Sequence, residues 1–267
     1  MDLNARFGLE FNPFVKNSRE ILVETKEYQE TVYRLNYLAK TRGFGLLTGA
    51  AGRGKTTAVR NWTASLNPSL FSVAYTCLST LTVQEFYRNL AAELGLQPVY
   101  RKADNFRLIQ AEITRMSMEK RRTPVIILDE ASYISSAILN DLKILFNFEM
   151  DSRDRAVILL SGLPQINTTL RLGVHEPLRQ RLVMNYHLEG LSKEEGREYL
   201  TAKLHGAGCH HSIFDDAAVE ALLNAADGTP RVINKLANAA LVIAHSKNLN
   251  SIDADTVMLA MNDCELG

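Results

Sequence analysis

Short runs of apolar residues alternate with amphipathic segments through the middle of the chain. The runs lie at 44–48, 71–76, 125–129 and 156–161, with a shorter one at 184–188. Apolar runs of this length, without polar alternation, are typical of parallel strands buried on both faces. Strands that alternate with helical patterns predict an α/β fold in which helices cover a parallel sheet. We therefore expect a core domain of this kind over residues 43–189.

The pattern changes after residue 189, where the strand signal stops. Helices are expected at 193–204, 215–226, 230–247 and 253–262. Ser192, Asp215 and Asp253 are residue types that cap helix N-termini, and Gly206 and Gly228 suit helix ends. Residues 190–267 are therefore predicted to form a small all-α domain. Residues 1–42 form the remaining part, with an aromatic leader at 7–14 followed by a helix.

Residues 49–56 fit the phosphate-binding pattern G-x-x-x-x-G-K-[ST]. A predicted strand precedes the pattern and a helix follows it, so a chance glycine-rich turn is the weaker alternative. The glycines let backbone N–H groups face phosphate oxygens, and the helix N-terminus adds the positive end of its dipole. Lys55 can reach the β- and γ-phosphates, and the Thr56 hydroxyl can ligate Mg²⁺. The predicted ATP-binding residues here are Gly49, Ala50, Ala51, Gly52, Arg53, Gly54, Lys55, Thr56 and Thr57.

The apolar run at 125–129 ends in two acids, Asp129 and Glu130. Ligands of open parallel sheets sit beyond the carboxyl ends of the strands, so Asp129 is expected beside Thr56, where it can hold Mg²⁺ through water. Glu130 is then placed to polarise an attacking water. Strands also end in acids that are merely solvated, but the phosphate-binding pattern favours the catalytic interpretation.

Four further residues fit an ATPase that works between subunits. Ser161 ends a predicted strand, where its hydroxyl can orient the lytic water or sense the γ-phosphate; a simple strand-terminal serine is the alternative. Arg181, with Arg179 as second choice, can reach a neighbouring subunit's nucleotide as an arginine finger. A solvated arginine pair is the other interpretation. Arg231 follows Pro230 at a helix start and can swing onto the γ-phosphate.

Composition adds little to the assignment of function. Lys and Arg number 30, and so do Asp and Glu, so any DNA contact must come from a local patch. Apolar runs are far short of a membrane span, and the N-terminus lacks the apolar centre of a signal peptide. Cys77, Cys209 and Cys264 are scattered and odd in number. These features predict a cytoplasmic protein with reduced thiols and no membrane contact.

Taken in order, these motifs resemble those of AAA+ ATPases over nearly the whole chain. The leader Phe7-Gly8-Leu9 … Asn12-Pro13-Phe14 and the segment Leu178-Arg179-Gln180-Arg181-Leu182 are similar to the ExeA-type group. That group includes ATPases of type II secretion and the ATPase partners of DDE transposases, of the TnsC, TniB and MuB kind. Many AAA+ proteins carry Asn where this chain has Ser161, which leaves the role of Ser161 less certain than that of Glu130.

The resemblance implies ATP and Mg²⁺ as cofactors and self-association into a ring or helical filament. Two functions compete. One is a regulator of transposition that binds double-stranded DNA with little sequence preference and recruits a DDE transposase. The other is an ATPase of secretion or envelope assembly, whose ExeA-type members carry a membrane segment and a wall-binding domain after the ATPase. Because this sequence stops at Gly267, we expect the first; a signalling NTPase would bring a further sensor or effector domain.

The expected DNA contacts follow the second strand, as the resemblance to TnsC-like proteins implies. The region runs from Cys77 to Thr82 and continues to residues 100–105. Thr80, Thr82, Arg101 and Lys102 are of the types that bind phosphate without reading bases. Thr80 and Thr82 are equally suited to cap the next helix, whereas the adjacent Arg101 and Lys102 lack an obvious structural role.

Overall fold

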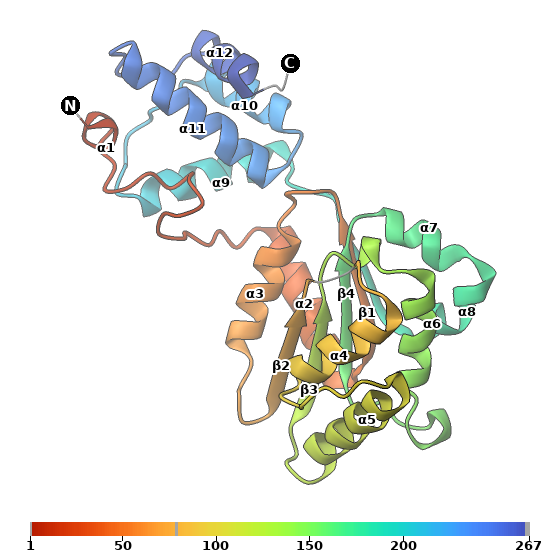
Figure 1. Ribbon diagram of the computed structural model, residues 1–267. Helices are drawn as coiled ribbons and strands as arrows, with labels where there is room; N and C mark the ends of the chain where they lie inside the picture. The colour runs from red at the N-terminus through yellow and green to blue at the C-terminus, as the bar shows by residue number, and fades with distance from the viewer. Residues whose placement is uncertain (1, 78–79, 265–267) are drawn as a thin grey trace. The chain divides into compact units, whose positions relative to one another are not determined.

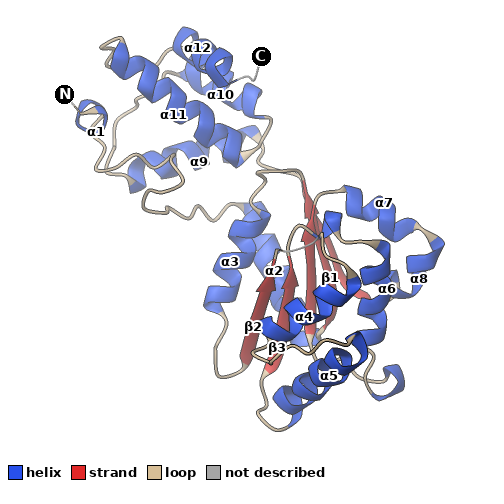
Figure 2. Ribbon diagram, viewed as in Figure 1, coloured by secondary structure: helices blue, strands red, loops and turns tan. Residues whose placement is uncertain are grey.

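One parallel sheet of five strands lies at the centre of the computed structural model, which describes residues 2–77 and 80–264 (Figures 1 and 2). The strands are β1 (Gly43–Gly49), β2 (Phe71–Thr76), β3 (Thr123–Leu128), β4 (Val157–Gly162) and β5 (Leu182–Leu188). Their order across the sheet is β2-β3-β4-β1-β5, and every pairing is parallel. The predicted α/β class and all five strands are confirmed.

Helices cover both faces of the sheet, which explains why its central strands are apolar on both sides. Every residue of β1, β3 and β4 is buried. One face packs on α2 (Lys26–Thr41) and α3 (Lys55–Ser65), through a cluster that includes Leu38 and Trp62. The opposite face carries α4 (Val83–Glu93), α5 (Lys102–Met118), α6 (Ser136–Leu145), α7 (Gln165–Arg171) and α8 (Glu176–Arg179). Three short 3₁₀ helices complete this unit: η1 (Ala131–Tyr133), η2 (Glu149–Asp151) and η3 (Gly173–His175).

The C-terminal residues form four helices, as predicted: α9 (Lys193–Gly206), α10 (Asp216–Ala226), α11 (Pro230–Ser246) and α12 (Ala254–Cys264). Ser192 and Glu195 form a reciprocal capping box on α9, and Asp215 accepts the Ala218 N–H at the start of α10. Gly206 lies inside α9 rather than beyond it. The left-handed turn after α10 is made by Asp227 and Gly228.

The aromatic leader is part of the core of the helical unit. It begins with α1 (Leu3–Arg6), and its Phe7, Leu9 and Phe14 are buried among α9–α12. Contacts divide the described chain into a helical unit (2–29, 52–54 and 189–264) and a sheet unit (30–51 and 55–188). The sequence placed residues 1–42 in one separate part. The difference arises because a short apolar segment cannot bury itself and instead covers an apolar face of α-helices. Among the described residues, no helix has the length and apolar character needed to cross a membrane.

Candidate nucleotide site

The carboxylate of Asp129 is the centre of the candidate site. Asp129 directly follows β3, is 6% exposed, and accepts four hydrogen bonds. Its Oδ2 accepts from Thr56 Oγ1 at 3.1 Å and from the Tyr75 hydroxyl at 3.0 Å. Its Oδ1 accepts from Ser161 Oγ at 2.8 Å and from the Glu130 N–H at 3.0 Å. The structure thus brings Thr56, Asp129 and Ser161 together at the carboxyl ends of adjacent strands, as their positions in the sequence suggested.

The phosphate-binding loop joins β1 to α3 and carries Lys55 at the start of that helix. Lys55 is buried, and its ammonium donates to the carbonyls of Gly49 at 2.7 Å and Ala50 at 3.1 Å. Gly54 has φ +102°, and a Cβ built there would meet no atom within 4 Å. A side chain at Gly54 would therefore enter open space, while Thr56 and Asp129 supply hydroxyl and carboxylate oxygens. Oxygen ligands of this kind suit Mg²⁺, so the residues present fit a magnesium nucleotide.

The loop after Asp129 is held in an unusual conformation. Glu130 is exposed and has φ 53°, in the left-handed region that non-glycine residues rarely adopt. Two residues further on, the Ser132 hydroxyl accepts from the Leu163 N–H at 2.5 Å and donates to the Leu163 carbonyl at 3.1 Å. A Cβ on Gly162 would lie 2.7 Å from Ser132 Oγ. The loop carrying Glu130 is therefore fixed closely against the end of β4.

Tyr75 is a site residue that the sequence analysis did not identify. It lies near the carboxyl end of β2, one position before Thr76, which is paired with Leu128 at the end of β3. Burial, and then the charge of Asp129, raise the pKa of Tyr75 above its ordinary value. The phenol therefore stays protonated, and its O–H donates a hydrogen bond to the Asp129 carboxylate. The sequence alone carried no signal for this contact, because it depends on β2 pairing with β3.

Ser161 is fully buried, and its hydroxyl proton is directed at Asp129. In this arrangement the side chain orients the carboxylate. Its direct action on a lytic water or on the γ-phosphate stays a prediction.

The two candidate finger arginines differ in their surroundings. The Arg181 guanidinium donates to the Lys143 carbonyl at 2.6 Å and pairs with Asp151, and its side chain is 20% exposed. Arg179 is exposed at the end of α8, where its guanidinium donates to carbonyls at the end of α7 at 3.2 Å. Arg179 is therefore the more accessible of the two for a neighbouring molecule, although the sequence favoured Arg181.

Arg53 and Arg231 both belong to the helical unit by their contacts. Arg231 is exposed on the first turn of α11, and its N–H lies 3.4 Å from the Gly52 carbonyl. The Arg53 guanidinium faces Asp227 at 3.4 Å, and a Cβ on Gly228 would approach it to 2.9 Å. Arg53 was predicted among the phosphate-binding residues, but here its side chain is directed at the turn after α10.

Comparisons with known proteins agree with this architecture. Residues 38–170 match the family described as AAA domain. The described chain superposes on Cdc6p from Pyrobaculum aerophilum with a TM-score of 0.71 at 12% identity, covering 96% of this chain and 71% of that one. This is an AAA+ fold. The Aeropyrum pernix ORC1 protein in complex with DNA has a TM-score of 0.63 at 16% identity, covering 95% and 69%. At such identities these two solved structures show the fold alone.

A comparison with curated protein sequences finds a relative whose name refers to secretion. General secretion pathway protein A of Aeromonas hydrophila is 31% identical over 259 residues, which are 95% of this chain and 47% of that protein. The chain therefore spans about half the length of the relative that it matches.

The residues predicted to contact DNA lie on the sheet unit of the AAA+ fold. Residues 78–79 of that segment lie outside the described residues. Thr82 is the N-cap of α4, with its hydroxyl engaged by Glu85, so the structural alternative raised for it is realised. Lys102 pairs with Asp141, whereas Thr80 and Arg101 are exposed. Arg101 occupies the N-cap position of α5 without a side-chain capping bond.

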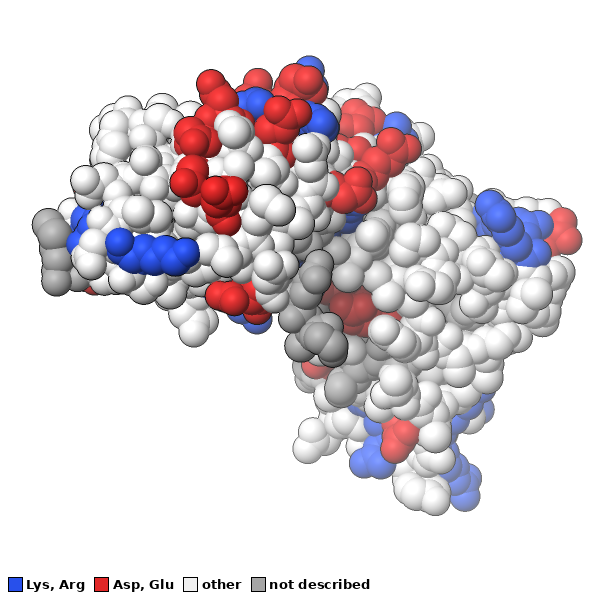
Figure 3. Space-filling model, turned by 90° about the horizontal axis from the view of Figure 1, so that it is seen from above, with Lys and Arg blue, Asp and Glu red and all other residues white. Residues whose placement is uncertain are grey.

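The zero net charge of the chain conceals an unequal distribution of charged residues. The sheet unit contains 19 Lys and Arg against 13 Asp and Glu, whereas the rest of the sequence, residues 1–29, 52–54 and 189–267, contains 11 against 17. Figure 3 shows Asp and Glu gathered on one part of the surface seen in that view. The excess of Lys and Arg over Asp and Glu therefore belongs to the sheet unit.

Proposed function

We propose that this protein is an ATPase that hydrolyses ATP to ADP and phosphate. The observation that carries the proposal is the buried Asp129 carboxylate, which is bonded to Thr56 and lies next in the chain to the exposed Glu130. A solvated acid at a strand end would not need four donors around it. Bound Mg²⁺ would neutralise charge on the transferring phosphoryl group.

Each residue has a distinct role in this proposal. Backbone N–H groups of Gly49–Thr57 and the Lys55 ammonium hold the phosphates, with Lys55 exchanging its carbonyl partners for phosphate oxygens. Thr56 and Asp129 hold the metal, and Ser161 and Tyr75 orient Asp129. Glu130 accepts a proton from the attacking water. Arg231 and one of the two finger candidates stabilise the γ-phosphate charge.

We further propose that the ATPase assembles on double-stranded DNA, binds it without reading sequence, and regulates transposition by recruiting a DDE transposase. The excess of six cations on the sheet unit supports a contact with phosphates, because backbone binding rests on Lys and Arg. Exposed Arg101 and Thr80 are the favoured contacts. Lys102 would have to leave Asp141 to join them.

Duplex binding tests this function. We expect the wild-type protein, with a slowly hydrolysed ATP analogue, to bind unrelated duplexes alike and to lose affinity steeply with salt. Arg101→Ala/Lys102→Ala should weaken binding and reduce the salt slope, with ATPase activity as the folding control. An unchanged salt slope would remove these two residues from the DNA site.

A secretion or envelope-assembly ATPase is the second candidate, favoured by the 31% identity to General secretion pathway protein A. The same experiment separates the two. If the wild-type protein binds no duplex in the presence of ATP or its analogue while hydrolysing ATP, the transposition proposal fails and the secretion proposal gains.

A further inference from the structure

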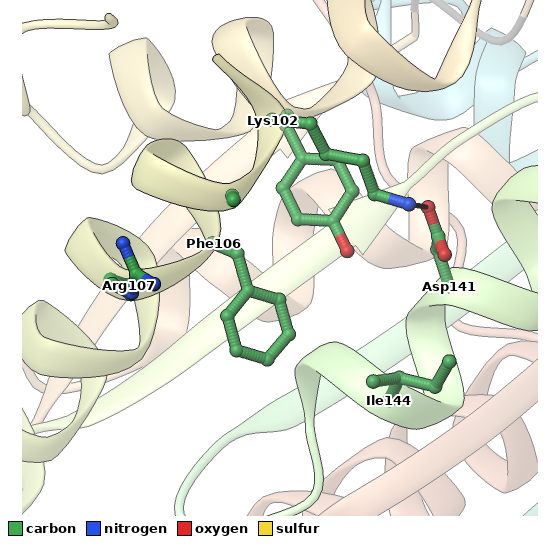
Figure 4. A pocket seen from close by; sticks show the side chains of 7 residues that line it. Lys102, Phe106, Arg107, Asp141 and Ile144 are labelled. Carbon is green, nitrogen blue, oxygen red and sulfur yellow. Dashed lines mark ion pairs between the residues drawn. The ribbon is translucent and has the colours of Figure 1, made fainter.

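A pocket of about 390 Å³ opens on the sheet unit between α4, α5 and α6. Its walls are mostly apolar: the ring of Tyr87, the ring of Phe106 and the half-exposed side chain of Ile144. Lys102 and Arg107 lie at its rim, and Lys102 pairs with Asp141 across it (Figure 4). Apolar walls are unsuited to a phosphate backbone, but they suit an apolar side chain of a protein.

Arg107 at the rim is available at low cost, whereas Lys102 is already engaged by Asp141 and by the ring of Tyr87. Arg107 is 77% exposed at its side chain, and its contact with Asp104 is a 3.2 Å surface pair. Pairs of this kind contribute little net stability, so they rearrange readily when a partner approaches. A complementary segment would therefore carry apolar side chains next to acidic ones.

The chain itself contains such a segment on α12. Thr256, Val257 and Ala260 bury one face of that helix in the helical unit. The opposite face carries the α12 stripe, spaced at helical intervals: Asp255, Met258, Leu259, Asn262 and Asp263. Met258 is 58% exposed and Leu259 is 40% exposed. Within the described part of the chain, neither Asp255 nor Asp263 makes an ion pair.

We propose that the α12 stripe of one copy docks into the α4–α6 pocket of a second copy. Met258 and Leu259 enter between Phe106 and Ile144, where methionine's flexible thioether fills an irregular cavity. Asp255 and Asp263 meet Lys102 and Arg107. The opposite net charges of the two units, +6 and −6 from their residue counts, steer the approach.

The contact joins two different surfaces, so it is head-to-tail and leads to a ring or an open filament. It rests on the proposed self-association and specifies which surfaces meet. Each copy uses its stripe on one neighbour and its pocket on the other.

Charge reversal in two separate proteins provides the test. The first variant is Asp255→Lys/Asp263→Lys, which faces its own basic pocket, and the second is Lys102→Glu/Arg107→Glu, which faces its own acidic stripe. With a slowly hydrolysed ATP analogue and without DNA, we expect each variant alone to need at least about tenfold more protein to assemble than the wild type, because like charges then meet. Mixed one to one, the two variants restore opposite charges at every contact and should assemble as the wild type does.

Glu198→Lys/Glu220→Lys is the matched control, since it makes the same charge change on exposed residues outside the stripe. Sedimentation velocity measures the assembled mass in every case. Recovery in the mixture also shows that both variants are folded. Unaltered assembly of the single variants, or a mixture that stays dissociated, would overturn the docking while leaving the ATPase intact. A wild-type protein that never assembles would contradict the proposed self-association itself.

Discussion

Replacing Ser161 by alanine tests how the site holds its acidic centre. The Ser161 hydroxyl donates one of the four hydrogen bonds to Asp129, at 2.8 Å, and the side chain is fully buried. Alanine leaves no donor there, and the buried position offers no easy access for water. A hydrogen bond to a charged group contributes about 1.5–3 kcal/mol, which corresponds to roughly 10- to 150-fold.

If Ser161 acts through Asp129, the loss appears first in the metal dependence. We expect Ser161→Ala to raise the Mg²⁺ concentration for half-maximal ATPase activity by about 10- to 100-fold, the usual effect of removing a group that orients a metal ligand. Steady-state ATP hydrolysis over a magnesium titration measures this. Ser65→Ala is the control, because it also removes a hydroxyl that donates a hydrogen bond, but this hydroxyl donates to the Trp62 carbonyl at the end of α3, away from Asp129. An unchanged magnesium midpoint with a lowered kcat would refute this reasoning and favour direct action of Ser161 on water or the γ-phosphate.

Three further predictions concern the phosphate-binding loop, the arginine finger and the pH dependence of stability. Lys55→Ala should abolish ATP binding in a fluorescent-nucleotide titration, because it removes the ammonium to which we assign phosphate binding; retained affinity would contradict this role. Arg179→Ala should lower the kcat of the assembled protein by about 10³-fold or more, and mixing it with Glu130→Gln subunits should restore some hydrolysis, whereas recovery only with Arg181→Ala would make Arg181 the finger. Burial, and then Lys143, lower the pKa of His175, so the stabilisation of its neutral form is complete above the ordinary value of 6.5 and is lost as the pH falls below it. Lowering the pH from about 7 to about 5 should therefore lower the melting temperature of the wild type more than that of His175→Gln. Thermal unfolding measures this, and equal losses of melting temperature in the two proteins would contradict it.

The sequence predicted best those features that follow from local residue patterns, such as buried strands and the residues at their ends. The central strands are buried on both faces and read as uninterrupted apolar runs, so their order along the chain and the meeting of Thr56 with Asp129 could be predicted. Contacts set by tertiary packing could not. Tyr75 donates to Asp129 only because β2 lies beside β3, and an isolated tyrosine in a strand carries no such signal.

Arginine side chains were the least predictable part of the site. A long guanidinium stem can reach several acceptors, and the sequence does not show which acceptor is near. In the structure Arg53 faces Asp227 and Arg181 faces Asp151, and the roles in nucleotide chemistry assigned to both stay predictions. The surface that covers the leader could not be predicted for a related reason: nothing local in Phe7 or Phe14 tells which apolar surface will cover them.

Glu130→Gln tests the central claim most directly. The substitution keeps the shape of the side chain and leaves the N–H bond to Asp129 in place, but it removes the carboxylate that accepts the proton of water. ATP binding and ATP hydrolysis are measured on the same preparation of the full chain. The account predicts wild-type affinity for ATP and a turnover lowered by about 10²-fold or more. Hydrolysis at the wild-type rate would contradict the assignment of Glu130 and, with it, the proposed mechanism.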